Sequence, residues 1–445
     1  MLTDVIAALA TPPGRSAVAL LRVSGHGTHA LAARVLSPYR LDRPRRSGVA
    51  RARHPVSGET LDEVLYTPFA APASFTGEDM VEIGTHGGLL VPAEVLAALR
   101  AAGARDAAPG EFTRRALANG RLDLLQAEAT GDLIDATAPA QRRAALRQLD
   151  QGLSRRISEL RARVLEIEAL VSYDIDFPEE DSGPVPPEQV DRATLGLRAA
   201  LDALLRTAGE GERLREGAVC VIAGAPNAGK SSLFNALLGA DRAIVTEVAG
   251  TTRDAIEAPA TCGGFPFRLV DTAGLREGGD RVERLGIDVS RRYLRAADLV
   301  LLCIEAGRER TTEEQRFLDE VTAPVVEVRT KADRCPDASA GALSVSVVTG
   351  DGLDLVRREL ARVAFERLSG SADMEPVITR ERQRQALARA RDEVEAFADA
   401  RRRDVEAVMA ATHLRAAVTA LEDVIGLVSA DDVLDRLFAT FCVGK

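Results

Sequence analysis

Apolar residues in the first part of the chain fall into short runs separated by turn-forming residues. The runs Val5–Leu9 and Val18–Arg22 flank Thr11–Arg15, a Pro- and Gly-containing stretch, which predicts a strand, a turn and a second strand. The segment Val91–Ala102 has the apolar spacing of a helix. Residues 1–118 are therefore predicted to form an α+β domain.

Beyond residue 121 the apolar residues recur at helical spacing over long stretches. This pattern runs from Leu122 to about Ser172, resumes over Arg192–Thr207, and returns after Ser369–Ser371 as Ala-, Arg- and Glu-rich sequence up to Ala439. These stretches are predicted to be long amphipathic helices.

Residues 216–368 alternate short apolar runs with helical stretches. This alternation is typical of a mainly parallel sheet in a three-layer α/β arrangement. The predicted strands are Val219–Ala223, Phe267–Val270, Leu299–Ile304, Val325–Val328 and Leu343–Ser346.

We therefore expect a multidomain protein that combines α+β and α/β architecture. The expected parts are an N-terminal domain (1–118), a discontinuous helical domain (119–210 and 372–445) and an inserted α/β domain (211–371). Such an insertion is tolerated when the ends of the inserted domain lie close together.

The composition of the chain indicates how many cores it can form and in which compartment we expect it. A length of 445 residues with 46% hydrophobic and 28% charged residues suffices for several cores. The five cysteines include no C-x-x-C pair, which favours a reducing cytoplasm over a zinc site or disulfide framework. No apolar run approaches a membrane span, and Met1–Asp4 lack the basic start of a signal peptide. We expect a cytoplasmic protein with no membrane partner.

The chain has one basic and one acidic cluster, and each has two possible interpretations. The net charge of −10 is not that of a protein that coats nucleic acid. The arginines clustered between Arg40 and Arg53 are either phosphate contacts or a solvated loop. The acidic stretch Asp174–Asp181 is either a cation site or, more simply, a solvated turn.

The first motif that indicates a specific chemistry contains one of the chain's few lysines. In a chain with 57 basic residues, lysine occurs only at positions 230, 331 and 445. Lys230 belongs to Gly224–Ser231, a complete G-x-x-x-x-G-K-S phosphate loop between a predicted strand and a helix. Lys230 is expected to reach the β- and γ-phosphates, and Ser231 to bind Mg²⁺. The predicted nucleotide-binding residues here are Asn227, Ala228, Gly229, Lys230, Ser231 and Ser232.

Two further loops extend this site. Asp271-Thr272-Ala273-Gly274 follows the predicted strand Phe267–Val270, where a carboxylate holds Mg²⁺ through water and the Gly274 N–H senses the γ-phosphate. The loop Gly250–Asp254 offers threonine hydroxyls to Mg²⁺, and such a loop orders with triphosphate and relaxes with diphosphate. All four residues of the first loop are predicted to bind the nucleotide.

Thr330-Lys331-Ala332-Asp333 predicts guanine as the base. The Asp333 carboxylate accepts from guanine N1–H and the exocyclic amine, a donor pair that adenine lacks. Thr330 stands where Asn is more usual, and Ser346-Val347-Val348 lacks the common third-position lysine. These departures leave the strength of guanine binding open. The ordered motifs together predict a Ras-like P-loop G domain.

The catalytic group is not the usual one. Leu275 occupies the position just after the D-x-x-G motif where Ras-type enzymes have a water-orienting glutamine. Catalysis must come from elsewhere. Asn227 is placed to hold a monovalent cation against the phosphates, with Thr246–Thr251 completing its oxygen shell, and such a cation neutralises developing charge.

On these motifs taken together, the chain resembles the MnmE (TrmE) family of tRNA modification GTPases over its whole length. The most specific elements are the first and the last of the matching segments. Those segments are Ala10–Arg15, Ser74–Asp79, His86–Gly88, Pro109–Phe112, Leu122–Leu124, Gln126–Ala129, Gly224–Ser231, Gly250–Asp254, Asp271–Arg276 and Phe441–Lys445.

The resemblance implies a G domain that dimerises across its nucleotide faces in a potassium-dependent way. Ser231 and Thr252 match the family's Mg²⁺ ligands, and Glu283 matches a carboxylate that positions the water network. With Asp271, Glu283 is the catalytic residue expected in this domain. The positions that match the potassium site are Asn227, Thr246, Val248 and Thr251, of which Thr246 and Thr251 also belong with Thr252 to the GTP site.

The resemblance also implies an N-terminal domain that is similar to folate-binding domains and forms a constitutive homodimer. Cys442 matches a family cysteine implicated in the modification step; from the residues alone it is equally an inert thiol. The folate-pocket positions are matched by Arg22, Glu82, Arg121 and Lys445.

The implied function is modification of the wobble uridine of certain tRNAs together with the FAD-dependent partner MnmG, in a heterotetramer. The product carries a 5-carboxymethylaminomethyl or aminomethyl group. Its methylene carbon comes from 5,10-methylene-tetrahydrofolate, of which 5-formyl-tetrahydrofolate is a stable analogue. GTP hydrolysis is expected to drive a conformational cycle.

Two rival readings account for less of the chain. A ribosome-assembly GTPase also has Leu after D-x-x-G, yet it explains only residues 216–368. A helical scaffold with a degenerate G domain is opposed by the intact Gly229-Lys230-Ser231 and by Asp271.

Overall fold

The computed structural model describes residues 4–42, 44–176, 186–239, 257–271, 293–335, 343–370, 376–426 and 431–444. Contacts divide the chain into two compact units, Met1–Gly131 with Ile425–Lys445, and Asp132–Val424. The finer division into three domains, suggested by the sequence, stays a prediction.

A seven-stranded sheet forms the first unit. Its strands are β1 (Ile6–Leu9), β2 (Gly14–Ser24), β3 (Leu36–Ser37), β4 (Gly48–Arg53), β5 (Thr60–Phe69), β6 (Met80–Gly88) and β7 (Arg105–Asp106). Their order is β3-β4-β5-β6-β2-β1-β7, and β1 and β2 form the antiparallel pair that the sequence predicts. Only the β1–β7 pair is parallel among these strands.

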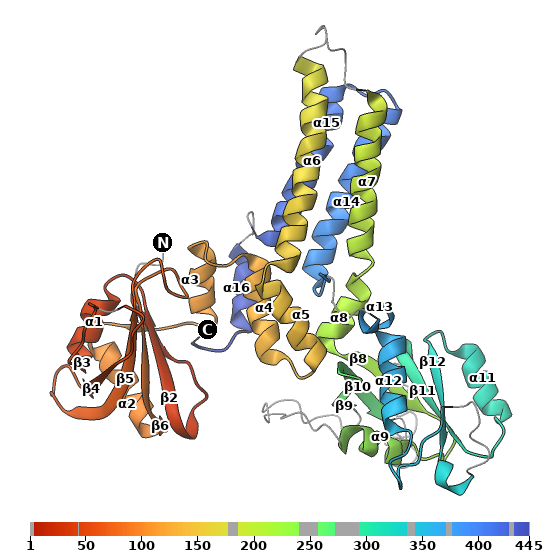
Figure 1. Ribbon diagram of the computed structural model, residues 1–445, viewed down its shortest axis with the longest axis horizontal. Helices are drawn as coiled ribbons and strands as arrows, with labels where there is room; N and C mark the ends of the chain where they lie inside the picture. Colours follow the sequence, from red (N-terminus) through yellow and green to blue (C-terminus); the bar gives the residue numbers. More distant parts are fainter. Residues whose placement is uncertain are drawn as a thin grey trace, which may run out of the picture. The chain divides into compact units, whose positions relative to one another are not determined.

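Helices α1 (Thr28–Val35) and α2 (Leu90–Ala101) cover one face of this sheet (Figure 1). The helix predicted at Val91–Ala102 is α2. Its apolar residues share a core with alternate residues of the central strands, because successive strand side chains point to opposite faces. This core includes Leu21, Val23, Leu31, Val35, Val81, Ile83, Val95 and Leu99. The prediction of α+β architecture is confirmed.

The last described residues of the chain complete the first unit. Helix α16 (Asp431–Ala439) packs against α3 (Glu111–Ala118), and Arg114 pairs with Asp435 at 2.7 Å. The Gly110 N–H donates to the Cys442 carbonyl oxygen at 3.4 Å. Helix α4 (Leu124–Asp135) begins within this unit.

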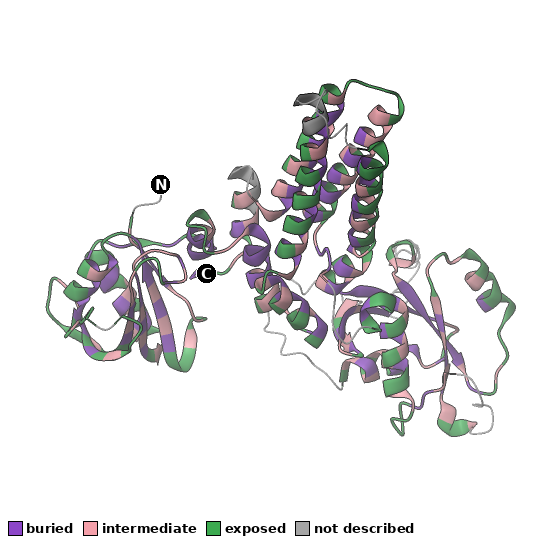
Figure 2. Cartoon of the chain, turned by 45° about the horizontal axis from the view of Figure 1, so that its top comes forward, coloured by how far each residue is buried: buried purple, intermediate pink, exposed green. Residues whose placement is uncertain are grey.

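The second unit contains the predicted long helices. They are α5 (Pro139–Leu149), α6 (Gly152–Asp176), α7 (Pro187–Leu205), α8 (Ala208–Glu216), α14 (Glu381–Arg402) and α15 (Ala407–Ile425). In α6 the residues at the predicted helical spacing are buried, and Figure 2 shows buried and exposed faces alternating around these helices. The buried residues of that stripe are Leu153, Ile157, Leu160, Val164 and Ile167.

Contacts between distant segments hold the helices together. Helix α7 packs against both α6 and α14. Arg161 of α6 pairs with Glu422 of α15 at 2.7 Å, and Arg198 of α7 pairs with Glu395 of α14 at 2.5 Å. Among the described residues, no helix combines the length and apolar character needed to cross a membrane.

The rest of the second unit is a five-stranded sheet with the order β12-β11-β8-β10-β9. The strands are β8 (Ala218–Ala223), β9 (Glu257–Cys262), β10 (Phe265–Asp271), β11 (Leu299–Glu305) and β12 (Val325–Thr330). Its helices are α9 (Lys230–Gly239), α11 (Thr312–Glu320), α12 (Leu353–Ala364) and α13 (Glu366–Ser369), with the short 3₁₀ turn η2 (Ala332–Arg334) after β12. All pairs are parallel except β9–β10.

Alternate residues of β8 enter two different cores. Cys220 and Ile222 belong to one apolar cluster, and Val219 and Val221 to the other. Both faces of the sheet are therefore covered, which confirms the predicted three-layer architecture. One predicted strand was wrong as a full strand. Residues 343–346 form only an isolated bridge, from Ser344 to Arg329, with backbone hydrogen bonds of 2.7 Å on either side.

Candidate functional site

The phosphate loop connects the end of β8 to the start of α9, as the sequence predicts. Gly224 has φ of +141°, and a Cβ atom there would lie 2.3 Å from the Cys303 carbonyl oxygen. Only glycine fits this close approach. Asn227 and Gly229 also have positive φ, 62° and 85°, and asparagine is among the few side chains that adopt this conformation readily. The sequence motif therefore sets the loop's backbone directly.

The Lys230 side chain is held inside this loop. It is 9% exposed, and its Nζ donates to the carbonyl oxygens of Gly224 at 3.0 Å and Ala225 at 2.8 Å. Ser231 and Ser232 are exposed at the start of α9. The N-terminus of a helix favours anions, because its first N–H groups have no intrahelical acceptor. Lysine, hydroxyls and helix N-terminus thus meet at one place.

Asp271 ends β10, the strand that pairs with β8. It is 8% exposed and lies opposite Ile222 in the parallel register. Burial raises the pKa of the Cys303 thiol to about 12, with the Lys230 charge lowering it and the Asp271 charge raising it. Because β8 and β10 are parallel neighbours, Asp271 and the loop that holds Lys230 both lie at the carboxyl end of the sheet.

The predicted base-reading residues converge at the neighbouring end of β12. The Ser346 hydroxyl donates to Asp333 Oδ1 at 2.7 Å, and this bond is the main reason that the pKa of the exposed Asp333 carboxyl is lowered. Lys331 Nζ donates to Glu305 Oε2 at 2.9 Å, which lowers the pKa of Glu305. A carboxylate that stays ionised and is oriented by a hydroxyl is suited to accept from a purine N–H pair.

The residues that depart from the usual motifs differ in how far they are buried. Thr330 is buried, and its hydroxyl donates to the Ala228 carbonyl oxygen of the phosphate loop at 2.7 Å. Val347 is 37% exposed and Val348 is 86% exposed. Sequence reasoning did not foresee the Thr330–Ala228 bond or the role of Glu305, since neither follows from a spacing along the chain.

Several predicted site residues lie outside the described residues, and their placement stays a prediction. They are Thr246, Val248, Thr251, Thr252, Thr272, Ala273, Gly274, Leu275, Glu283 and Lys445.

The described donors fit a magnesium nucleotide in part. Ser231 offers an exposed hydroxyl beside Lys230, and the Asp271 carboxylate ends the neighbouring parallel strand, which suits a hard cation that keeps water ligands. Of the expected potassium ligands, only Asn227 is described. Within the described part of the chain, no group of three His, Cys, Asp or Glu residues is arranged to hold a metal ion.

Two of the expected folate residues, Arg22 and Glu82, are neighbours in the sheet of the first unit. Arg22 on β2 is the cross-strand neighbour of Glu82 on β6, and its Nε donates to Glu82 Oε1 at 3.0 Å. Its Nη1 donates to the Gly444 carbonyl oxygen at 3.3 Å, and its guanidinium lies 5.7 Å from the Phe75 ring centroid. Gly444 therefore lies at Arg22. Cys442 is exposed.

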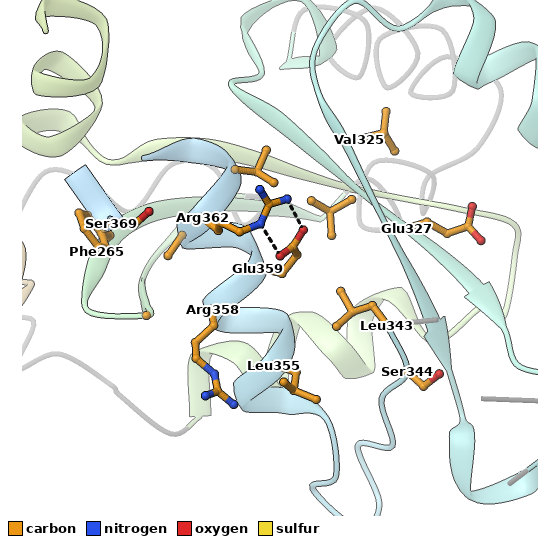
Figure 3. A pocket seen from close by; sticks show the side chains of 14 residues that line it. Phe265, Val325, Glu327, Leu343, Ser344, Leu355, Arg358, Glu359, Arg362 and Ser369 are labelled. Atoms are coloured by element: carbon orange, nitrogen blue, oxygen red, sulfur yellow. Dashed lines mark hydrogen bonds and ion pairs between the residues drawn. The ribbon is translucent and has the colours of Figure 1, made fainter. Parts of the chain in front are cut away.

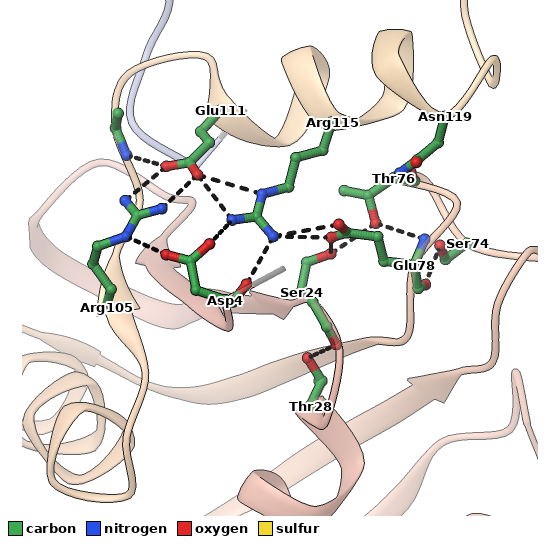
Figure 4. A network of polar contacts seen from close by, with 12 residues as sticks. Asp4, Ser24, Thr28, Ser74, Thr76, Glu78, Arg105, Glu111, Arg115 and Asn119 are labelled. Atoms are coloured by element: carbon green, nitrogen blue, oxygen red, sulfur yellow. Dashed lines mark hydrogen bonds and ion pairs between the residues drawn. The ribbon is translucent and has the colours of Figure 1, made fainter. Parts of the chain in front are cut away.

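An ion cluster around a buried arginine, which the sequence did not reveal, supports the segment 74–79 that carries Phe75. Arg115 of α3 is 1% exposed and points into a group of three carboxylates, Asp4, Glu78 and Glu111 (Figure 4). Arg115 Nη2 donates to Asp4 Oδ1 at 2.8 Å and to Glu111 Oε1 at 2.9 Å, and Nη1 donates to Glu78 at 3.3 Å.

Segment 74–79 also lies beside the expected folate residue Arg121. Asn119 Nδ2 donates to the Thr76 carbonyl oxygen at 2.8 Å. A Cβ atom on Gly77, whose φ is +78°, would lie 3.0 Å from Arg121 Cγ. Arg115 and Asn119 thus hold segment 74–79, in which Phe75 contacts Arg22 and Gly77 lies beside Arg121.

Two hollows of the second unit differ in their relation to these residues. One, of about 270 Å³, is lined partly by Gly224, Ala225 and Pro226 of the phosphate loop. The other, of about 960 Å³, lies between α12 and β12 (Figure 3), where Arg362 donates to Glu359 at 2.7 and 2.8 Å. None of the residues lining the larger hollow is a predicted site residue.

Known proteins are similar to this chain over nearly all of its length. A family model described as the MnmE helical domain matches residues 124–442, and one described as the GTP-binding protein TrmE N-terminus matches residues 5–121. Three relatives that bear the name tRNA modification GTPase MnmE are 45%, 41% and 39% identical to the chain. They come from Methylorubrum populi (99% of this chain, 98% of the relative), Moorella thermoacetica (100% and 100%) and Aquifex aeolicus (99% and 100%).

Proposed function

Because this chain belongs to the MnmE family of tRNA modification GTPases, we propose that it hydrolyses GTP to support modification of the wobble uridine in certain tRNAs. In this proposal it acts with the FAD-dependent partner MnmG in a heterotetramer. The group installed is 5-carboxymethylaminomethyl or aminomethyl, and 5,10-methylene-tetrahydrofolate supplies its one-carbon unit. The cytoplasm is the compartment in which this chemistry takes place.

The observation that carries the GTPase proposal is the meeting of three independent motifs at one edge of the sheet. The Lys230 loop follows β8, Asp271 ends β10, and Asp333 with Ser346 follows β12. Carboxyl ends of parallel strands share one edge, and nucleotides bind there in open α/β sheets. The relatives' name independently states a GTPase.

Each residue has a distinct part in the proposed reaction. The Lys230 ammonium, which contacts two carbonyls of its own loop, turns to the β- and γ-phosphate oxygens when nucleotide binds. Ser231 and Thr252 would hold Mg²⁺, and Asp271 would accept from a water molecule bound to the ion. Asp333 accepts from the guanine N1 and N2 hydrogens.

In this proposal a bound potassium ion would supply positive charge beside the phosphates, where negative charge develops. Asn227, Thr246, Val248 and Thr251 supply its ligands, and Glu283 orders the attacking water. Such an ion would supply stabilisation that a glutamine assists in Ras-type enzymes and that the apolar Leu275 side chain cannot provide.

The first unit binds the folate and forms the homodimer in this proposal. Arg22, Arg121 and Lys445 are cations suited to the folate carboxylates, and Glu82 is an acceptor suited to the pterin amine edge. The Arg22–Glu82 pair and the nearby Gly444 carbonyl support it. We assign the folate-binding and dimerising part to residues 1–118, the helical part to 119–210 and 372–445, and the G domain to 211–371. Cys442 takes part in the modification step.

A two-part measurement tests the proposal. GTP turnover is compared in K⁺ and Na⁺ buffers of equal ionic strength, and binding of 5-formyl-tetrahydrofolate is measured on the same preparation. The expected result is turnover that K⁺ stimulates, together with folate binding that Arg22→Gln weakens. Turnover that is the same in both buffers contradicts the potassium role, and lack of folate binding contradicts the role of the first unit.

The alternative is a ribosome-assembly GTPase. It predicts GTP turnover without folate binding, so the same measurement separates the two. The matches to residues 5–121 and 124–442, which flank or enclose the G domain, favour the tRNA modification function.

A further inference from the structure

Asp62 and His86 form a bonded pair at one end of the sheet in the first unit. The His86 main-chain N–H donates to Asp62 Oδ2 at 2.8 Å, and His86 Nδ1 lies 2.7 Å from Asp62 Oδ1. The pairing of β5 with β6 ends at Leu65 and Gly84, so the carboxylate takes an N–H that lies beyond the last strand pair. The Asp62 side chain is 9% exposed, whereas the His86 side chain is 73% exposed. A buried carboxylate thus holds an exposed imidazole.

Asp62 decides which nitrogen of the His86 ring carries the proton. An ionised carboxylate only accepts hydrogen bonds, so Nδ1 is the donor, and the neutral ring then has no proton on Nε2. A carboxylate that fixes the tautomer in this way prepares the imidazole for proton transfer at its other nitrogen. Nε2 is therefore left as the acceptor of a largely exposed ring.

Two other histidines each lack one part of this arrangement. His54 Nδ1 accepts from two main-chain N–H groups at 3.4 and 3.3 Å, so its neutral ring carries the proton on Nε2. His413 Nδ1 lies 2.6 Å from Glu393 Oε2, but the side chain of this carboxylate is 36% exposed, and the pair belongs to the second unit. His86 thus differs from His54 in its tautomer and from His413 in the burial of its carboxylate partner.

His86 lies on the face of the sheet that carries the expected folate residues Arg22 and Glu82. The odd-numbered residues from 81 to 85 of β6 are buried, so the alternate residues Glu82, Gly84 and His86 share the opposite face. Arg22 is the cross-strand neighbour of Glu82 and shares this face. Four residues along the strand place Glu82 and His86 about 13 Å apart, and Gly84 between them has no side chain to separate them. One elongated ligand could therefore reach both.

We propose that His86 is a proton-transfer residue for a ligand bound on this face, and that Asp62 positions it. The inference rests on the proposed folate-binding function of the first unit and deepens it. The ligand class is one with amine nitrogens, such as a reduced folate, that gain or lose a proton as a one-carbon unit is released or taken up. In the donor direction, the imidazolium gives its Nε2 proton to the ligand nitrogen and becomes a neutral ring that keeps its Nδ1 proton toward Asp62. The reverse transfer restores the imidazolium, so no further reactant is needed.

Carbethoxylation by diethyl pyrocarbonate, which attacks unprotonated imidazole nitrogen, tests the accessibility of His86 on the full-length chain. Peptide mass spectrometry gives the rate for each histidine. His86 should react in the unliganded chain, and 5-formyl-tetrahydrofolate at about ten times its Kd should slow this reaction about tenfold, because the ligand covers the ring. The exposed His26 should react equally fast with and without the ligand. A His86 that is unreactive in the free chain, or that stays reactive when the ligand is bound, would overturn the inference.

The pH profile of the same reaction tests the positioning role of Asp62. In Asp62→Asn the imidazolium loses the carboxylate beside it, so the midpoint of the His86 reaction should move to lower pH by about 0.5–1 unit. Glu63, the next residue on β5, keeps its charge in this variant. Glu393→Gln is the matched control and should move the midpoint of His413 but not that of His86. An unchanged His86 midpoint in Asp62→Asn would mean that Asp62 only caps the main-chain N–H.

The reconstituted modification reaction of the proposed function tests proton transfer itself. His86→Gln keeps a polar side chain that does not titrate, and general acid–base groups contribute about 10²–10⁴-fold to a rate. The variant should still bind 5-formyl-tetrahydrofolate but should modify tRNA about 100-fold more slowly or worse. His54→Gln is the matched control and should keep both the affinity and the rate. A wild-type rate in His86→Gln would contradict the proton-transfer role.

The protection measurement uses the wild-type chain, so it decides the question even if a variant fails to fold. The proposed function has a separate readout. If 5-formyl-tetrahydrofolate does not bind to the wild-type chain, the folate-binding proposal itself fails, and this inference fails with it. If the ligand binds and leaves His86 as reactive as before, only the inference fails.

Discussion

The Ser346 hydroxyl donates a hydrogen bond to Oδ1 of Asp333 over 2.7 Å. It is the largest single cause of the lowered pKa of the Asp333 carboxyl, which lies below its ordinary value of 3.8. The carboxylate is exposed, so the hydroxyl mainly fixes its direction. Ser346 thereby orients the acceptor oxygen of Asp333, which lies in the turn after β12.

Ser346→Ala should weaken GDP binding by about three- to tenfold at neutral pH, because an oriented acceptor loses its partner. Asp333 remains ionised there with or without the hydroxyl. Its depressed pKa favours the ionised state above about pH 4, and this benefit is lost as the pH falls through the lowered value. The acid limb of GDP affinity should therefore move to higher pH in the variant.

Calorimetric titration with GDP across the acid range checks this expectation. Ser369→Ala is the matched control, since Ser369 is exposed and bonds only locally to the Glu366 carbonyl oxygen. An unchanged GDP affinity in Ser346→Ala would contradict the orienting role of the hydroxyl.

Gly224→Ala should impair the phosphate loop, whereas Gly239→Ala should not. At Gly224 the new methyl group would lie 2.3 Å from the Cys303 carbonyl oxygen at a φ of +141°. At Gly239, near the end of α9, a Cβ atom meets nothing within 4 Å. Strain of about 1–3 kcal/mol in the loop predicts GDP affinity lower by about tenfold or more, together with a lower melting temperature. Equal GDP affinities in the two variants would show that the loop tolerates the methyl group.

The parts of the site that sequence could predict are those with local backbone geometry. A phosphate loop is a contiguous segment whose glycines set its own φ angles, so its residues and its place after β8 followed from spacing alone. The strand predicted at Leu343–Ser346 failed because an apolar run does not decide how many backbone pairs form. There, only Ser344 reaches a bridge with β12.

The parts that sequence could not predict depend on residues far apart along the chain. The Thr330 hydroxyl meets a carbonyl 102 residues away, and Arg115 meets Asp4 at a separation of 111 residues. Neither pairing has a periodic or local signal. Arginine in a short helix usually indicates a solvated surface, so the buried Arg115 cluster was invisible until the fold was known.

Arg22→Gln should lower the affinity for 5-formyl-tetrahydrofolate by about tenfold or more. The substitution removes a charge that is only partly exposed and that pairs with Glu82. Arg53→Gln, an exposed position on β4, is the matched control and should leave folate affinity unchanged. Fluorescence titration of the full-length chain measures both. Equal losses in the two variants would indicate a general charge effect and not a folate contact.

Arg115→Met should destabilise the first unit far more than Arg100→Met. Arg115 is 1% exposed among Asp4, Glu78 and Glu111, whereas Arg100 forms an exposed pair with Asp106. Removing a buried ion partner costs up to about 3–5 kcal/mol, because the buried Glu111 then keeps only Arg105 as a charged partner and Glu78 loses its bond to Arg115. An exposed pair contributes about 0–1 kcal/mol. Hydrogen exchange of α3 and β1 peptides, with α12 peptides as an internal reference, measures the difference in the full-length chain.

The pH dependence of the first unit's stability is a second test of the ion cluster around Arg115. Hydrogen bonding to Arg105 lowers the pKa of Asp4 from 3.8 to about 2, with Arg115 contributing. Burial alone would raise the pKa of Glu111, but bonds from Arg105, the Ala108 N–H and Arg115 outweigh it and lower the value. Depressed carboxyl pKa values stabilise the fold above the ordinary values, and this stabilisation disappears as the pH falls through the depressed ones. Wild type should lose protection of α3 between about pH 4 and pH 2. The Arg115→Met variant should lose less of this protection over the same pH range. An equally steep loss would mean that Arg115 does not hold these carboxylates ionised.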